Sequence, residues 1–369
     1  SLLTVALVAC ASFLILAISA FRLAPSEEGT GGFVLVAQSD QPIHHDLNTP
    51  EGRIELGFRS ADEKLLDRFR VHALRVHDGE DASCLNLYQT RQPRVLGVPD
   101  PAAVLARFAF GDGGAALEED DATVPAALDF NTAMYSLKLY GGVGSRLTIR
   151  DGVDQPVDVE VAGLLKNSIL QGDLLVAERD FLELYPATGG YRFFLIEPTA
   201  ADERNTLADS GELAAMLEDR LSDYGFDAED AERRLAGFLA VQNTYLSTFQ
   251  SLGALGLLLG AVGVAVVQLR NLVERRGELA LLRAAGFTTG SLRTLILREN
   301  LALLVGGLVI GAVAAGVALA PQAWTDDTRT PWGDSLVLLG VIAAIGLLVG
   351  SVLTRRAARA PILAALRGD

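Results

Sequence analysis

The sequence predicts a membrane protein with four transmembrane α-helices and a large mixed α/β extracytoplasmic domain inserted between helices 1 and 2. Three observations lead to this fold class: four long uncharged apolar runs, an acidic block between the first two, and arginine-rich segments after the second and fourth. Half of the 369 residues are hydrophobic, the mean hydropathy is +0.30 and the formal net charge is −15. This composition excludes a disordered or fibrous chain, and its acidity argues against nucleic-acid binding.

Each apolar run is about as long as the ~20 residues that cross a hydrocarbon core. The runs are Leu2–Phe21, Leu252–Leu269, Leu301–Pro321 and Leu336–Leu353. We place the four helices at residues 1–21, 249–269, 300–321 and 335–354. Cys10 gives the first run some likeness to a lipoprotein cleavage site, but the run continues past this cysteine, which favours a span. Because the chain starts at Ser1 directly on an apolar run, we expect a C-terminal portion whose upstream part is missing.

Arginine placement sets the predicted orientation. The loop 270–299 and the tail 355–369 each carry a net charge of +3, whereas the short loop 322–334 carries −2. Positively charged loops stay on the cytoplasmic side, so the loop and the tail are expected inside and the short loop outside. Residues 22–248 then also lie outside. With 20 lysine and arginine residues against 39 aspartate and glutamate residues, they form an acidic block of net charge −19.

The outer block has the hydrophobic pattern of a mixed α/β domain. Val157, Val159 and Val161 alternate with acidic residues, as in a half-buried strand. The other strand candidates are Phe33–Ala37, Arg94–Val98, Leu147–Arg150, Leu174–Val176 and Phe193–Ile196. Helices are expected at Ala102–Phe108, Ala177–Leu184 and Leu213–Leu221. The glycine-rich and then acidic segment Gly111–Pro125 is expected to be a mobile loop.

A stalk helix at about 229–248 is expected to continue into the second span. Apolar and glycine positions recur there at alternating spacings of four and three, which is a heptad pattern. Its large side chains are Leu235, Leu239, Leu246 and Phe249, and its membrane portion uses Gly253, Gly256, Gly260 and Gly263. Glycines on one face favour close packing by a neighbouring helix, although glycine is common in spans in any case. Such a continuous helix would move as one rod.

No catalytic constellation is present, so the sequence does not predict an enzyme. It contains no phosphate-binding loop motif, no zinc-protease motif and no nucleophile-elbow motif. The histidines match no recognised ligand spacing, so we expect solvated loop histidines and no metal. They are His44, His45, His72 and His77. The spans carry no ionisable residue of the kind that marks an ion-coupled carrier, so energy for any transport must come from elsewhere.

The most specific signal lies in the cytoplasmic coupling segment 270–299, where residues 274–286 predict an amphipathic helix that stops at a glycine. A helix that merely rests on anionic lipid is the alternative. The segment contains Glu274, Arg275, Glu278, Leu279, Leu282, Arg283, Ala284 and Gly286. This pattern resembles the FtsX-like permease family of ABC transporters, of the MacB and lipoprotein-releasing type. Glu299 followed by Gly307 and Gly311 is similar to the family's entry into the third span, where these glycines would pack against a helix.

The resemblance implies a dimeric, multi-pass permease in the bacterial inner membrane, either a homodimer or paired with a second permease half. Its other partners would be a cytoplasmic ABC ATPase, membrane lipid and an extracytoplasmic protein. This chain has no ATPase motif and is expected to need no cofactor of its own, because the ATPase, separate or fused upstream, would bind the ATP. The implied function is export or extraction of a substrate. The alternative is an FtsX-like transducer that activates an extracytoplasmic partner, such as a cell-wall hydrolase, without transport.

The orientation can be tested by cysteine labelling on intact cells. Glu118→Cys, in the acidic block, should react with a membrane-impermeant maleimide. Arg356→Cys, in the positive tail, should be protected until the membrane is permeabilised, because positive segments stay inside. Equal labelling of both positions on intact cells would overturn the predicted topology.

Overall fold

The computed structural model describes residues 23–80, 92–114, 123–199, 203–274 and 276–325, with Thr90, Leu117 and isolated positions between 5 and 16 and at 340 and 344. The chain divides into two compact units. We call Leu23–Gln242 the α/β unit, and Ser1–Arg22 together with Asn243–Asp369 the helical unit. The acidic segment 118–121 and most of the first and fourth expected spans lie outside the described residues.

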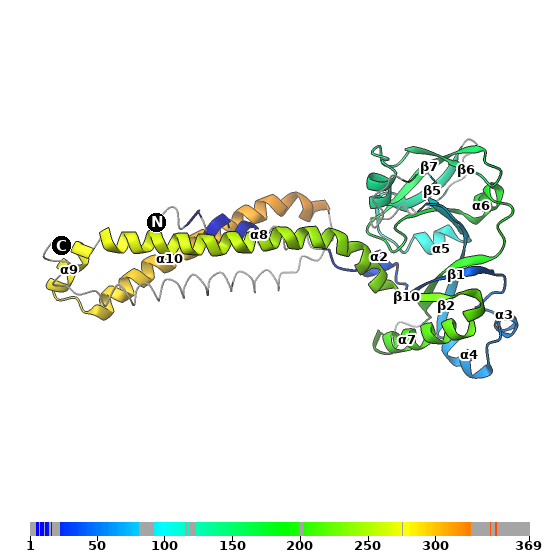
Figure 1. Cartoon of the computed structure of the whole chain (residues 1–369), viewed down its shortest axis with the longest axis horizontal. Helices are drawn as coiled ribbons and strands as arrows, with labels where there is room; N and C mark the ends of the chain where they lie inside the picture. Colours follow the sequence, from blue (N-terminus) through cyan, green and yellow to red (C-terminus); the bar gives the residue numbers. More distant parts are fainter. Residues whose placement is uncertain are drawn as a thin grey trace. The chain divides into compact units, whose positions relative to one another are not determined.

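The described strands of the α/β unit form one ten-stranded mixed sheet (Figure 1). The strand order is β10-β1-β9-β2-β3-β8-β5-β7-β4, and β6 pairs with β7. β3 runs parallel to β8 and β5 parallel to β7, while the other pairs are antiparallel. The strands are β1 Leu35–Ile43, β2 Phe69–His77, β3 Arg94–Val98, β4 Phe110–Gly113, β5 Val124–Asp129, β6 Arg146–Arg150, β7 Pro156–Leu165, β8 Asp173–Ala177, β9 Tyr191–Pro198 and β10 Asp227–Asp230.

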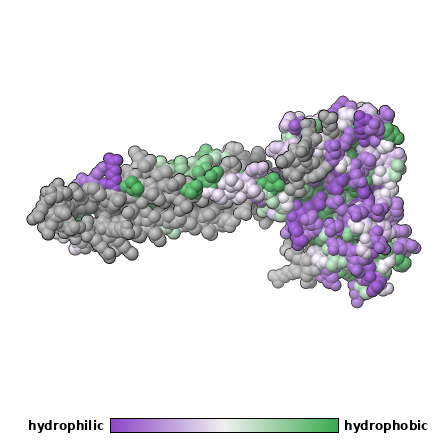
Figure 2. Space-filling model, in the orientation of Figure 1, coloured by the Kyte–Doolittle hydropathy of each residue, from purple (hydrophilic) through white to green (hydrophobic). Residues whose placement is uncertain are grey.

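The short helices of this unit begin where polar side chains cap them. Ser26, Thr49 and Asp100 accept hydrogen bonds from the first turns of α2, α3 and α5, and a proline opens α3 and α5. The α-helices are α2 Glu27–Thr30, α3 Pro50–Glu55, α4 Ser60–Leu66, α5 Pro101–Leu105, α6 Glu178–Leu184 and α7 Glu203–Arg220. A π-helical turn, η1, spans Thr132–Ser136, and a 3₁₀ turn, η2, spans Ser222–Tyr224. The visible surface of the unit is mostly hydrophilic (Figure 2).

Alternating strand residues divide the interior into three buried clusters. Phe193 points into a central cluster, which also contains side chains of β1, β2, β3, α5 and the next helix, α8 (Ala231–Glu274). Its neighbour Phe194 points into a second cluster under α7. The third cluster lies between β5, β7, β8, α6 and η1, with Phe181 fully buried. Burial on both faces explains why the inner strands are nearly continuous apolar runs.

The structure corrects several details of the expected elements. The strand expected at Phe33–Ala37 begins two residues later and runs to Ile43, and the helix expected at Ala102–Phe108 ends at Leu105. The expected stalk starts at Ala231, because residues 229 and 230 still pair with β1 as part of β10. β2, β4, β5 and β10 were not expected from the sequence, because their patterns are short or interrupted by charge. The expectation of a mobile loop over Gly111–Pro125 is wrong at both ends, because β4 ends and β5 begins inside this segment and both strands pair with β7.

The helical unit contains most of α8, then α9 Arg276–Ala284 and α10 Thr289–Thr325. The second and third expected spans fall within α8 and α10. Both helices extend well beyond them, so helical residues occupy most of the coupling segment and reach into the short loop 322–334. Among the described residues, one helical segment, Gly290–Ala318, is long and apolar enough to cross a membrane by the criteria of length and hydropathy.

Gly97 on β3 offers a test of the packing between β3 and α6. An added Cβ there would lie 2.7 Å from Cγ of the buried Phe181, so Gly97→Ala should destabilise the α/β unit by about 1–3 kcal/mol. The matched control is Gly211→Ala on α7, where an added Cβ meets open space. Alanine there should increase the stability of the folded unit by about 0.5–1 kcal/mol, because glycine is unfavourable inside a helix. The measurement is the temperature at which residues 23–242 lose protease resistance in the detergent-solubilised chain. Equal midpoints for the two variants would contradict this packing.

Candidate functional site at the root of helix α8

Helix α8 begins inside the α/β unit. Ala231, Leu235 and Leu239 are spaced by four residues and have exposed fractions of 0%, 1% and 4%. They belong to the central cluster, against side chains of the sheet. The first seam positions of the expected stalk therefore lie in the protein core and anchor the helix. Leu246 is half-buried, and the side chain of Phe249 lies outside the described residues.

A short loop contacts the root of α8. We call residues 166–172, which connect β7 to β8, the 166–172 loop. An added Cβ at Gly29 of α2 would lie 2.6 Å from the carbonyl oxygen of Asn167 and 2.8 Å from Cδ2 of Leu235. Glycine at this position therefore lets α2, the 166–172 loop and α8 pack against one another at close range.

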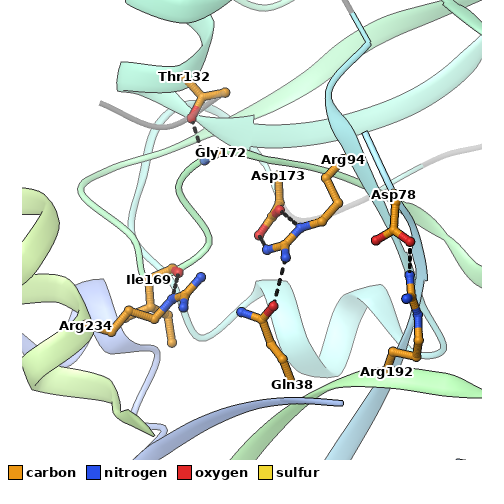
Figure 3. Close-up of polar contacts among 9 residues, drawn as sticks. All are labelled: Gln38, Asp78, Arg94, Thr132, Ile169, Gly172, Asp173, Arg192 and Arg234. Carbon is orange, nitrogen blue, oxygen red and sulfur yellow. Dashed lines mark hydrogen bonds and ion pairs between the residues drawn. The ribbon is translucent and has the colours of Figure 1, made fainter. Parts of the chain in front are cut away.

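Arg234 is the polar contact between α8 and this loop (Figure 3). Its Nε donates a hydrogen bond of 3.1 Å to the carbonyl oxygen of Ile169. The guanidinium carbon lies 5.9 Å from the ring centre of Phe193 and 5.4 Å from that of Phe238, both distances suited to cation–π contact. Glu229 lies 3.8 Å away. Burial lowers the pKa of Arg234, and nearby Asp173 opposes that shift. Arginine remains charged despite this, so a largely but not fully buried positive charge, 15% exposed, lies at the root.

An ion pair between the buried Asp173 and the partly exposed Arg94 links two strands of the sheet. Arg94 and Asp173 face each other on β3 and β8. Nε and Nη2 of Arg94 donate hydrogen bonds to Oδ1 and Oδ2 of Asp173 at 2.6 and 2.9 Å. Nη1 of Arg94 donates a third hydrogen bond to Oε1 of Gln38 on β1 at 3.0 Å. Figure 3 shows this set beside Arg234 and the Asp78–Arg192 pair. Two-point Arg–carboxylate contacts fix orientation strongly, so β1, β3 and β8 are held in register.

The expected coupling residues lie around α9. Glu274 ends α8 and pairs with Arg270 at 2.7 Å. After α9, Gly286 has φ of +98°, the left-handed conformation that ends helices. Leu282 is half-buried, whereas Glu278 and Ala284 are exposed. Arg275 and the side chains of Leu279 and Arg283 lie outside the described residues. The sequence analysis did not single out Leu281 and Phe287, which are 68% and 52% exposed.

The helix-packing glycines separate into two groups. The packing around Gly253, Gly256, Gly260 and Gly263 is outside the part of the chain that the structure describes. Gly307 and Gly311 on α10 contact the first expected span. An added Cβ at Gly307 would lie 2.8 Å from Cβ of Val8, and one at Gly311 would collide with Oγ of Ser12. Close approach through small residues is typical of helix pairs in membranes.

Two of the four histidines correct the expectation of solvated loops. His72 and His77 lie on β2, where each has a specific partner. Nε2 of His72 lies 2.8 Å from Oε1 of Glu197 on β9, and Glu197 also pairs with Arg107. His77 stacks on Tyr185, with ring centres 3.7 Å apart. These contacts fix β2 and could not be found from the sequence, because the partners are more than a hundred residues away.

The chain is similar in sequence to permeases of ABC transporters. Residues 251–362 match the model of the FtsX-like permease C-terminal family. Over 92% of its length the chain is 24% identical to the uncharacterized ABC transporter permease YknZ of Bacillus subtilis, of which it covers 92%. It is 28% and 26% identical to the macrolide export ATP-binding/permease proteins MacB of Hyphomonas neptunium and Rhodospirillum rubrum, over 57% and 52% of this chain. It covers only 34% and 31% of those two proteins.

Two solved structures also show similarity. The periplasmic region of MacB from Actinobacillus actinomycetemcomitans aligns with a TM-score of 0.31 and 14% identity, over 56% of this chain and 92% of that one. The extracellular domain of the transporter YknZ from Gram-positive bacteria aligns with a TM-score of 0.26 and 15% identity, over 53% of this chain and 100% of that one.

The contact between α10 and the first span can be tested with two glycines of one helix. Gly311→Leu should lower the thermal stability of the detergent-solubilised chain, because the side chain would collide with Ser12. Gly316→Leu, five residues further along α10, meets open space and should be tolerated. Leucine is strongly apolar, so both variants should still insert into the membrane. Equal melting temperatures for the two variants would show that the contact does not support the helical unit.

Proposed function

Because the chain belongs to the FtsX-like permease family of ABC transporters, we propose that it is the membrane subunit of an ABC complex of the FtsX/MacB type. In this proposal a cytoplasmic ATPase drives a movement of α8, and the α/β unit uses that movement outside the membrane to export or extract a substrate. The chain itself would bind no nucleotide, since the ATP belongs to the ATPase.

One observation carries the proposal: α8 is a single 44-residue helix with a buried root. Its first turns are fixed in the α/β unit by Leu235, Leu239 and Arg234. Its last residue, Glu274, adjoins the coupling residues around α9. A hydrogen-bonded helix passes a displacement along its axis better than a loop does, because its backbone dihedral angles are fixed.

The ATPase would dock around α9. Leu281 and Phe287 are largely exposed there, next to the charged residue Glu278. Apolar side chains rimmed by charged residues are typical of protein interfaces. The dimer partner, another copy or a second permease half, would contact the helices of the helical unit, and the remaining apolar surface would face lipid. The α/β unit would then lie outside the bacterial inner membrane, as the arginine distribution predicts.

A second function, the activation of an extracytoplasmic protein without transport, is favoured by one feature of the α/β unit. Phe130, Tyr135 and Tyr140, within and beside η1, have exposed fractions of 42%, 73% and 74%. Exposed aromatic side chains are common energetic centres of protein interfaces. Movement of substrate by the reconstituted complex separates the two functions, because only an exporter or extractor moves substrate.

The docking site can be tested by affinity capture from solubilised membranes. The wild-type chain should co-purify with an ABC ATPase, and Arg283→Glu on α9 should reduce the recovered ATPase at least about tenfold, because charge reversal opposes a charged partner surface. The matched control is Arg233→Glu, an exposed arginine of the α/β unit, which should recover the ATPase as wild type does. Undiminished recovery with Arg283→Glu would exclude docking at this residue. Absence of any ABC ATPase from the wild-type sample would contradict the function itself.

A further inference from the structure

The 166–172 loop is tied to the α/β unit by its backbone. Its residues Ile169 and Leu170 are fully buried in the central cluster. The backbone N–H of Lys166 donates to the carbonyl oxygen of Ala109 at 2.8 Å, and that of Ile169 donates to the carbonyl oxygen of Gly29 at 3.0 Å. The loop therefore has a defined position that depends on each element it contacts.

At one side of the loop stands a buried carboxylate, Asp129, at the end of β5. Its Oδ2 accepts bonds from the backbone N–H and the hydroxyl of Ser168, at 2.8 and 3.2 Å. Its Oδ1 accepts bonds from the side-chain amide of Gln171 at 3.2 Å and from the backbone N–H of Asn131 at 2.9 Å. The exposed fraction of Asp129 is 0%. Burial raises the pKa of this carboxyl group, and the four hydrogen bonds oppose that shift.

The same side of the loop is joined to η1. The backbone N–H of Gly172 donates to Oγ1 of Thr132, the first residue of η1, at 2.9 Å (Figure 3). Asn131, which also donates to Asp129, immediately precedes this turn. A π-helical turn is uncommon and is frequently found at functional sites. Asn131, just before η1, is therefore bonded to Asp129, which binds the loop, and Thr132, the first residue of η1, is bonded to the loop itself.

At the other side of the loop stands the buried arginine of α8. Arg234 binds the carbonyl oxygen of Ile169, and Asp129 binds the N–H of the preceding residue, Ser168. Hydrogen bonds to charged groups are roughly twice as strong as neutral ones and are directional. Apolar packing alone would let the loop slide, whereas these bonds fix two neighbouring backbone groups to two different elements.

We propose that Arg234 and Asp129 are positioning residues through which the 166–172 loop couples the root of α8 to η1. A displacement of Arg234 moves Ile169, the loop moves Asp129 and Thr132, and the surface that carries Phe130 and Tyr135 shifts with them. This inference rests on the proposed function only for the origin of the displacement. The coupling itself is a property of the folded α/β unit and needs no ATPase.

Hydrogen–deuterium exchange of the full chain in detergent tests the coupling. The reporters are the amides of Leu137 and Leu139, which donate to carbonyl oxygens of η1 at 3.0 and 2.8 Å. Arg234→Met replaces the apolar stem of arginine with an apolar side chain of similar length and removes the hydrogen bond to Ile169. Hydrogen exchange at these two amides should become about tenfold faster. The matched control, Arg192→Met, removes a pair with the exposed Asp78 and should leave η1 unchanged.

Coupling is reciprocal, so the perturbation must also work in the opposite direction. Asp129→Asn replaces one acceptor oxygen with a donor and should speed exchange both at η1 and at the Leu235 amide of α8. In the double variant with Arg234→Met, the two effects on η1 should be less than additive, because both act through one loop.

Three results would overturn the coupling: no change at η1 in Arg234→Met, a uniform rise across the sheet including β3, or fully additive effects in the double variant. None of these bears on ATPase capture by the wild-type chain. A failed coupling and a failed permease function are therefore separate outcomes.

Discussion

The burial of the first turns of α8 is the constraint on which the rest of the structure depends. Leu235 and Leu239 belong to one buried cluster with side chains of the sheet and with Ile169 and Leu170, so the first turns of α8 are part of the core of the α/β unit. A helix joined to a domain by a flexible segment could move without consequence for that domain. Because the side chains of this root are buried and protein interiors are close-packed, neighbouring residues must accommodate any displacement of the helix.

Charged groups give that packing its specificity. Removing a charge from water is costly, and the cost is offset only when the group is paired and hydrogen-bonded. Arg94 and Asp173 satisfy each other in a two-point contact. Arg234 binds a backbone carbonyl of the 166–172 loop, and Asp129 accepts three of its four hydrogen bonds from Ser168 and Gln171 of the same loop. A core of leucine alone would tolerate several positions of the helix, whereas these directional bonds favour one.

Different interactions stabilise the inside of each unit. In the α/β unit, large apolar side chains such as Phe181 and Phe193 fill the interior, and their removal from water is the driving force. In the helical unit, α10 contacts the first expected span through Gly307 and Gly311, the kind of close approach through small residues that is typical of helices in lipid, where this force is absent. Glycine has the same role in both units, because its missing side chain lets Phe181 approach β3 at Gly97 and lets a helix approach α10 at Gly311.

The sequence by itself determined the apolar runs, the acidic block, the glycine that ends α9 and the strands β3, β8 and β9, because each depends on composition or short-range periodicity. It could not locate the candidate site. Arg234 and Ile169 are 65 residues apart, and Asp129 and Ser168 are 39 apart. An arginine in an amphipathic helix and an aspartate at a strand end look solvent-exposed until the sheet order places them. Only the tertiary structure, by bringing distant groups within hydrogen-bonding distance, decided that Asp129 is fully buried, that Arg234 is largely buried, and that both bind one loop.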